Sequence, residues 1–130
     1  MPIRSIFNKV KDLPTRLGPF SHAQDVEGGF LYISGHGPYD PNVGKFVCNT
    51  IAEQTTLSFA CIERLLKKAG ARRDQVVNCR IYIDNIDEES YEAMNGAYSL
   101  FFGDHRPTRN TIGATLLDIG VEIECVACLE

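Results

Sequence analysis

Residues 106–127 read RPTRNTIGATLLDIGVEIECVA and contain two apolar stretches separated by the short connector LLDIG. Both stretches have the length and the branched apolar residues that are typical of strands near a protein core. We predict strands at about 109–115 and 120–128. Because the connector between them is short, we expect the two strands to pair directly as an antiparallel hairpin.

Three charged side chains interrupt these apolar strands. Arg109 carries a planar, permanently protonated guanidinium whose donors match the two oxygens of a carboxylate. Glu122 and Glu124 lie two residues apart, so they share one face of their strand. Either Arg109 binds the carboxylate of a small substrate, or it forms a structural ion pair with one of the glutamates. The glutamates in turn either hold a cation and a water molecule or form a solvated face.

Two helices are predicted upstream of these strands. The first begins at a capping box formed by Thr50 and Glu53 and ends at Gly70. The second covers residues 88–102. Both helices carry an apolar stripe at helical spacing. In the second helix this stripe consists of Tyr91, Met94, Tyr98, Phe101 and Phe102.

The remaining elements indicate a sheet that is covered on one side only. We predict strands at 30–35 and 76–84, with a loop or hairpin at 37–46 between the first strand and the first helix. Two helices can cover only one face of such a sheet. The other face still carries apolar residues, so we expect it to be buried by self-association.

The composition is that of an ordinary globular domain, here residues 1–130, with 44% hydrophobic residues and a net charge of -4. The densest positive clusters, Lys67–Lys68 and Arg72–Arg73, lie near the end of the first predicted helix, where the helix dipole favours cations. We therefore expect no nucleic-acid partner. No apolar run reaches the ~20 residues of a membrane span. We expect no membrane partner and a cytoplasmic location, and the basic start MPIRSIFNKVK leaves an organelle leader as the alternative.

Five cysteines are scattered through the apolar segments. An odd number of this kind suits a reducing compartment better than a disulfide framework, so we expect five free thiols. Cys125 and Cys128 form a C-x-x-C pair, but residues three apart in a strand point to opposite faces. The pair therefore predicts neither a metal site nor a redox centre.

The three histidines, His22, His36 and His105, lack the spacing of metal ligands. Each is expected to be a surface or internally satisfied residue. His36 follows Ser34 and Gly35 at the end of a strand, where side chains often face a cleft. The chain has no nucleophile elbow, P-loop or dinucleotide-binding glycine pattern, and we expect no cofactor and no metal.

Seven short blocks occur in an order and at spacings that resemble the RidA/YjgF family of reactive-intermediate deaminases. The resemblance runs from Gly18 to Ala127. The blocks are GPFSHA (18–23), LYISGHGPYDP (31–41), EQT (53–55), AG (69–70), MNGAYSLFF (94–102), RPTRNT (106–111) and VEIECVA (121–127).

This resemblance implies an α+β fold of the chorismate-mutase-like type, a mixed sheet with two helices on one face. It also implies a barrel-like homotrimer in which three sheets face inward and the active sites lie between subunits. The implied reaction is the hydrolysis of a small carboxylated enamine or imine to ammonia and a keto acid, without a cofactor.

The resemblance also assigns residues to roles. Arg109 is implied to bind the substrate carboxylate and Glu122 to orient the attacking water, which makes them the catalytic pair. The implied substrate-binding residues are Phe20, His22, Ser34, Gly35, His36, Asn95 and Thr111.

Several positions depart from the family pattern. Phe20 replaces a tyrosine, and His22 and His36 each replace a glutamine. Gly37 replaces a bulky aliphatic residue, and Thr111 replaces a frequent cysteine. Since these changes cluster around the implied site, they favour a specialised substrate, such as an aminomuconate-like enamine, at least as well as broad clearance of small enamines.

Two other functions stay open from the sequence. The chain could be a trimeric metabolite-binding or regulatory protein that keeps Arg109 to sense a carboxylated ligand. It could also hydrolyse a bond other than an imine, since some members of the family are described as ribonucleases. The acidic net charge argues against an RNA substrate.

Overall fold

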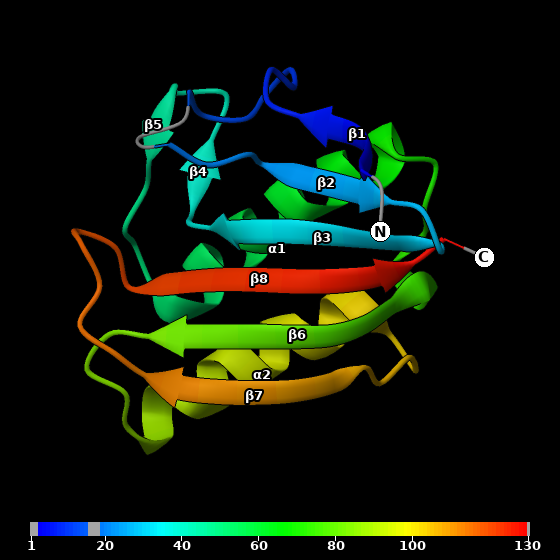
Figure 1. Cartoon of the computed structure of the whole chain (residues 1–130). Helices are drawn as coiled ribbons and strands as arrows, with labels where there is room; N and C mark the ends of the chain where they lie inside the picture. Colours follow the sequence, from blue (N-terminus) through cyan, green and yellow to red (C-terminus); the bar gives the residue numbers. More distant parts are fainter. Residues whose placement is uncertain (1–2, 16–18, 130) are drawn as a thin grey trace.

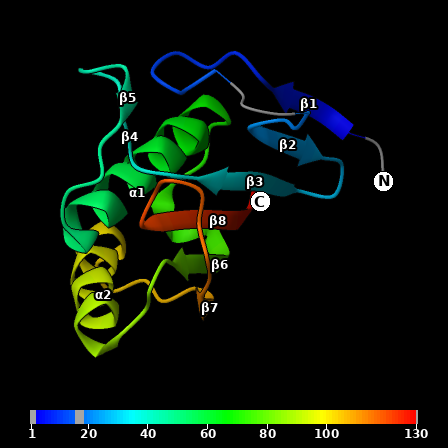
Figure 2. The ribbon, with the colours of Figure 1, turned by 90° about the vertical axis from the view of Figure 1, so that its left-hand side faces the viewer.

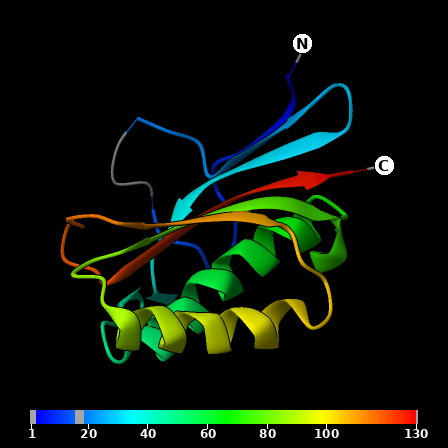
Figure 3. The same cartoon turned by 90° about the horizontal axis from the view of Figure 1, so that it is seen from below.

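In the computed structural model, which describes residues 3–15 and 19–129, a six-stranded mixed sheet carries two helices on one face (Figures 1 and 3). The strand order across the sheet is β1-β2-β3-β8-β6-β7. These strands are β1 (Ile3–Phe7), β2 (Ala23–Val26), β3 (Phe30–His36), β6 (Val76–Ile83), β7 (Thr108–Gly113) and β8 (Val121–Cys128). The architecture predicted from the sequence, a mixed sheet with two helices on one side, is confirmed.

The two helices begin and end where the local sequence predicts. In α1 (Ile51–Lys68), the Thr50 hydroxyl accepts a hydrogen bond from the Glu53 amide at 3.2 Å, and Gly70 follows with a positive φ of 78°. In α2 (Glu88–Phe102), the carboxylate of Asp87 accepts a hydrogen bond from the Ser90 amide at 2.7 Å. Before α1, the short strands β4 (Tyr39–Asp40) and β5 (Lys45–Phe46) form the predicted hairpin, and a 3-10 turn (Arg73–Gln75) follows α1.

The prediction that the last two strands pair with each other is wrong. β7 pairs in parallel with β6, and β8 pairs antiparallel with both β6 and β3, so β6 lies between the two strands (Figure 1). Residues 114–120 connect them around the end of β6. This path is held by hydrogen bonds from the Ala114 amide to the Ile83 carbonyl and from the Asp84 amide to the Gly120 carbonyl. The connector is therefore a crossover around one strand.

β8 lies in the middle of the sheet and shows the alternation of a half-covered strand. Its odd-numbered residues are buried beneath the helices, whereas Glu122, Glu124, Val126 and Cys128 lie on the opposite face. This confirms that Glu122 and Glu124 share a face and that Cys125 and Cys128 do not. All five cysteines are free thiols, as predicted.

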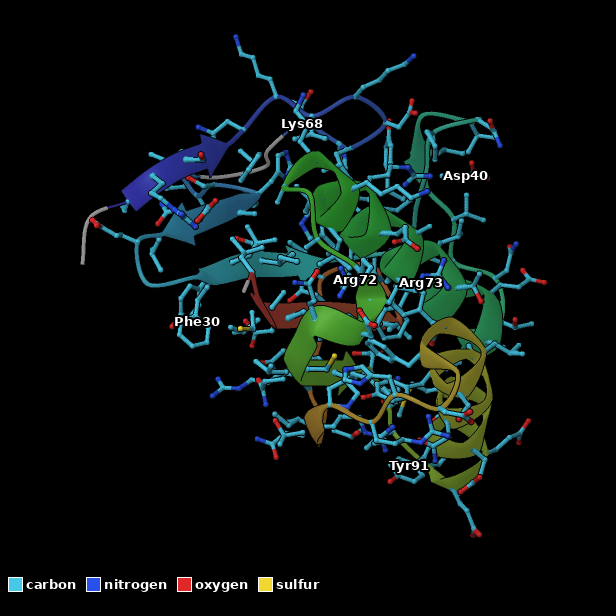
Figure 4. All side chains as sticks on the ribbon, turned by 90° about the vertical axis from the view of Figure 1, so that its right-hand side faces the viewer. Phe30, Asp40, Lys68, Arg72, Arg73 and Tyr91 are labelled. Atoms are coloured by element: carbon cyan, nitrogen blue, oxygen red, sulfur yellow. The ribbon has the colours of Figure 1, made fainter. Side chains whose placement is uncertain are left out.

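The face of the sheet away from the helices, here called the open face, has no covering layer among the described residues (Figures 2 and 3). Several large apolar side chains on it are exposed, including Tyr32 at 51%. Figure 4 shows Phe30 on the side of the sheet away from α1 and α2. The strand registers place Ile3, Ile6, Phe30, Tyr32 and Ile112 on this face. In the described parts of the chain, neither helix combines the length and the apolar character that crossing a bilayer requires.

Candidate functional site

Glu122 borders a cavity of about 240 Å³ at one end of the sheet, here called the Glu122 pocket. Four segments far apart in the sequence meet there: the segment before β2, the end of β3, the β4–β5 hairpin, and the connector of residues 114–120 with the start of β8. The described lining residues are Pro14, Thr15, Phe20, His22, Gly35, His36, Gly37, Phe46, Leu116, Leu117, Ile119 and Glu122. The structure thus brings together five of the residues that the family resemblance assigns to the site.

The Glu122 carboxyl is half-buried, and this burial raises its pKa. The negative charge of Glu124 on the same face raises the pKa further. Gly35 lies so close that a Cβ atom there would stand 2.8 Å from Oε2 of Glu122. A glycine at position 35 therefore leaves the space that this carboxyl occupies.

The two histidines of the pocket form a stacked, buried pair. The rings of His22 and His36 have centroids 5.5 Å apart and planes 25° apart. Burial, and then the charge of His22, lowers the pKa of His36 to about 4, so His36 is neutral at pH 7. Phe20 contacts His22 edge-on with the ring centroids 6.5 Å apart. This wall of the pocket is therefore aromatic, and its His36 ring is uncharged at neutral pH.

Ser34 fixes the end of β3 to the segment before β2. Its hydroxyl donates a hydrogen bond to the carbonyl of Ser21, and its amide donates to the carbonyl of His22 at 3.0 Å. The register between β3 and β8 shifts between Ile33 and His36, so the strand is irregular at this point. Ser34 also borders a hollow of about 400 Å³ over the open face. That hollow follows the uncovered sheet, and it contains none of the other predicted site residues.

Arg109 lies elsewhere, on the edge strand β7, with its side chain against α2. Its Nη2 donates a hydrogen bond to the Tyr91 hydroxyl at 3.0 Å, and its Cζ stands 4.8 Å from the centroid of the Tyr98 ring. Figure 4 shows Tyr91 extending from α2. The sequence marked both tyrosines only as part of the apolar stripe of the second helix. Both tyrosines lie on the stripe of the helix that faces the sheet. Their polar aromatic side chains on that stripe were the signal that they could contact a charged residue of the sheet.

Asn95 and Thr111 belong to the same helix-covered side as Arg109. Thr111 follows Arg109 by two positions in β7, and Asn95 lies in α2. The buried Oδ1 of Asn95 and Oγ1 of Thr111 have no hydrogen-bond partner in the described part of the chain. Leaving a buried polar atom unsatisfied costs free energy. The Asn95 oxygen is therefore suited to accept a hydrogen bond from a ligand or a second chain, and the Thr111 hydroxyl to accept or donate one.

The predicted catalytic pair is divided between the two faces of the sheet. Arg109 aligns with the buried Cys79 on the helix-covered face, whereas Glu122 aligns with Tyr82 on the open face. Within the described chain, no carboxylate lies within 4.0 Å of Arg109. The interpretation of an ion pair between Arg109 and a glutamate therefore fails within one chain.

Glu124 has partners of its own on the open face. It accepts a hydrogen bond from the Tyr82 hydroxyl at 2.8 Å, and its Oε1 lies 3.9 Å from Nη1 of Arg80. Glu124 is therefore anchored, while its neighbour Glu122 faces the pocket.

Sequence reasoning missed the apolar part of the pocket. Phe46 comes from the β4–β5 hairpin, and Leu116, Leu117 and Ile119 come from the connector of residues 114–120. Three apolar residues in a short connector are unusual for an exposed turn, and that was the signal that this segment lines a cavity. The place of this connector beside the pocket could not be predicted from the sequence, because it depends on the crossover around β6.

The chain is similar to known proteins along nearly its whole length. A family model described as Endoribonuclease L-PSP matches residues 10–129. A RutC family protein of Pyrococcus abyssi is 34% identical over 90% of this chain and 91% of its own length. The chloroplastic Reactive Intermediate Deaminase A of Arabidopsis thaliana is 30% identical over 89% of this chain and 62% of its own length.

Solved structures show the same arrangement of helices and strands. The Rid-family protein YyfA of Yersinia pestis superposes with a TM-score of 0.82 at 32% identity, covering 94% of this chain and 97% of that chain. The yjgF gene product of E. coli superposes with a TM-score of 0.83 at 23% identity, covering 97% of this chain and all of that chain. The second likeness shows the fold alone.

Proposed function

Because the chain belongs to the Endoribonuclease L-PSP family and has a reactive intermediate deaminase among its relatives, we propose that it hydrolyses small carboxylated enamines or imines. The products are ammonia and a keto acid, and no cofactor takes part. The observation that carries this proposal is the half-buried Glu122 carboxyl with a raised pKa at the edge of the Glu122 pocket. A raised pKa makes the ionised carboxylate a stronger base, which suits it to accept a proton from water.

Each side chain then has a defined task in the reaction. The enamine tautomerises to its imine, and the fork of Arg109 binds the substrate carboxylate and fixes the imine carbon. Water attacks that carbon while one of its protons passes through Glu122 to the nitrogen, which gives a carbinolamine. The hydroxyl proton then moves to the amine, the carbon–nitrogen bond breaks, and ammonia leaves as the keto group forms.

This reaction needs a site built from two subunits, because Arg109 and Glu122 lie on opposite faces of one sheet. Arg109 is on the edge strand β7, where a neighbouring chain can approach it. The open face carries exposed apolar side chains that association would bury. We propose the homotrimer with inward-facing sheets that the family resemblance implies, in which the Arg109 of one subunit faces the Glu122 of the next.

The described walls of the pocket favour a substrate with an apolar side chain. Phe46 and Ile119 fill the space beside Gly37, where a Cβ atom would stand 2.9 Å from Cδ1 of Ile119 and 3.1 Å from Cε1 of Phe46. Among the described lining residues there is no lysine or arginine to receive a second carboxylate. This lining supports the imine of an apolar amino acid over an aminomuconate-like dicarboxylate.

The proposal is tested by generating imines in solution. An amino-acid oxidase would form the imines of alanine, leucine and glutamate, and the release of ammonia and keto acid would be followed with and without the protein. We expect acceleration for the alanine and leucine imines and less for the glutamate imine. If no imine is hydrolysed faster while a keto acid binds, the protein is a metabolite-binding protein.

Two variants identify the catalytic pair. Two charge-assisted hydrogen bonds from Arg109 are worth roughly 3–6 kcal/mol, so Arg109→Ala should lower kcat/KM by on the order of a hundredfold or more. Arg109→Lys should restore little, because an ammonium cannot replace the planar fork. Glu122→Gln should lower kcat while keto-acid binding survives. Arg106→Ala is the matched control, since the Arg106 guanidinium donates hydrogen bonds to the nearby carbonyls of Gly103 and His105. Parental turnover in folded Arg109 and Glu122 variants would leave the proposal without its catalytic residues.

A further inference from the structure

Hydrogen bonds hold the connector of residues 114–120 along its length, although connectors of this kind are commonly mobile. The Leu116 amide donates a hydrogen bond to the Asp84 carboxylate at 2.9 Å, and the Cys48 thiol donates to the Asp118 carbonyl at 3.3 Å. The Gly120 carbonyl accepts a bond from the Asp84 amide at 3.0 Å. These bonds come from two places, the end of β6 and the segment before α1.

Gln54 makes the most deeply buried of these attachments. This α1 residue is only 4% exposed, and its Oε1 accepts a hydrogen bond from the Gly120 amide at 2.8 Å. Its Nε2 donates to the Asn49 carbonyl at 3.0 Å. Both ends of the amide are therefore used, which fixes the side chain between the start of α1 and the end of the connector.

The contact between Gln54 and Gly120 is also sterically close. A Cβ atom at position 120 would stand 2.9 Å from Oε1 and 3.0 Å from Nε2 of Gln54. The backbone at Gly120 thus lies directly against the amide group. Val121, the first residue of β8, follows immediately, and Glu122 is the next residue.

We propose that Gln54 is a positioning residue for the catalytic carboxyl, acting on Glu122 through the Gly120 amide. This inference rests on the proposed function. Gln54 sets the point at which the connector becomes β8 and therefore where the Glu122 carboxyl stands in the pocket. The pocket wall formed by Leu116 keeps its own hydrogen bond to Asp84, which does not involve Gln54. Arg109 lies on another strand and does not depend on this contact.

Because Gln54 acts on Glu122 and not on Arg109, its loss should change kcat and leave substrate binding nearly unchanged. In Gln54→Ala, Glu122 loses its fixed position while carboxylate binding by Arg109 remains. We expect kcat for imine hydrolysis to fall on the order of tenfold, since misplacing a catalytic group is costly. KM and the dissociation constant of the keto-acid product should change by less than about twofold.

Gln75→Ala is the matched control. Gln75 also accepts a backbone hydrogen bond through Oε1, from the Arg72 amide at 2.9 Å, but it lies in the 3-10 turn outside the pocket. Its loss should leave kcat unchanged. Gln54→Glu keeps an acceptor of the same length for the Gly120 amide and should retain more of kcat than Gln54→Ala. A Gln54→Glu variant as slow as Gln54→Ala would overturn the role of the Gly120 bond.

Amide hydrogen exchange provides a readout that is independent of turnover. Gln54→Ala should speed exchange at Gly120 and at the adjacent Val121 and Glu122, whereas Gln75→Ala should not. Faster exchange together with parental kcat would overturn the proposal, and so would a loss shared equally by kcat and product binding. If the parent protein hydrolyses no imine, the proposed function fails, and that failure is seen in the parent rather than in the variants.

Discussion

Glu122 titrates beside Glu124, whose negative charge adds to burial in raising the Glu122 pKa. Ionised Glu122 accepts the proton of water in the proposed reaction, so activity is lost as the pH falls through this pKa. Glu124→Gln removes the neighbouring charge but keeps an oxygen for the Tyr82 hydroxyl. The acid limb of the kcat/KM profile should therefore move to lower pH in this variant. An acid limb that stays in place would mean that another group controls it.

His36 makes the stability of the fold sensitive to acid. Its folded-state pKa is about 4, below the ordinary value of 6.5, so between these values the unfolded chain binds a proton that the folded chain does not. Stability is therefore full above about pH 6.5 and falls as the pH is lowered toward 4. At pH 5 the loss from this residue is about 2 kcal/mol.

A substitution isolates the contribution of His36. His36→Gln should reduce the difference in unfolding free energy between pH 7 and pH 5, measured by urea denaturation at both pH values. Equal differences in the parent and the variant would show that the buried ring does not set the acid sensitivity.

The close contact between Gly35, at the irregular end of β3, and Glu122 can be tested by substitution. Gly96 in α2 serves as the control position. In Gly35→Ala the new methyl group would meet the end of the Glu122 side chain, which can rotate away, so kcat should fall with little loss of stability. In Gly96→Ala no described atom outside the helix's own backbone lies within 4 Å of the new methyl group, and an alanine inside α2 should stabilise the protein by roughly 0.5–1 kcal/mol. Activity and melting temperature of both variants are the measurements. Equal activity in the two variants would contradict the role of the close contact at Gly35.

Both helices and four strands of the six-stranded sheet were predicted, because each has a local cause, whereas β1 and β2 were not predicted. Thr50 and Gly70 mark the ends of α1, and the alternation in 121–128 marks a half-covered strand. The pairing of β7 was not predictable, since a short connector is compatible both with a hairpin and with a crossover around one strand. The choice depends on β6, which lies more than thirty residues upstream of β8 and supplies the hydrogen bonds that guide the connector.

For the candidate site too, local features were predictable and features that depend on strand pairing were not. Arg109 and Glu122 were recognisable because a charged residue in an apolar strand is costly to bury unless it has a partner or a function. Their placement on opposite faces was hidden, because it requires the strand order as well as the alternation within each strand. The support of Arg109 by Tyr91 and Tyr98 was equally hidden, since apolar stripes on helices usually pack into a core.

At the scale of the whole molecule, the open face should control both assembly and activity. Tyr32→Asp places a charge on this face at a side chain that is 51% exposed in the single chain, so folding should be preserved. Leu100→Asp changes a residue that is 85% exposed on the helix side and serves as the control. Sedimentation should show a trimer for the parent and the control and smaller species for Tyr32→Asp, with loss of imine hydrolysis. A Tyr32→Asp variant that stays trimeric and active would show that the open face takes no part in subunit association.

The central place of β8 also has a consequence for how the polypeptide reaches its folded state. Every other strand of the six-stranded sheet precedes β8 in the chain, yet β8 is the strand that joins β3 to β6. Until it has been synthesised, the group β1-β2-β3 and the pair β6-β7 share no backbone ladder. Unpaired strand edges are open to association with other chains. A nascent polypeptide that stops before Val121 therefore exposes two such edges, and the sheet can close only after translation has passed Cys128.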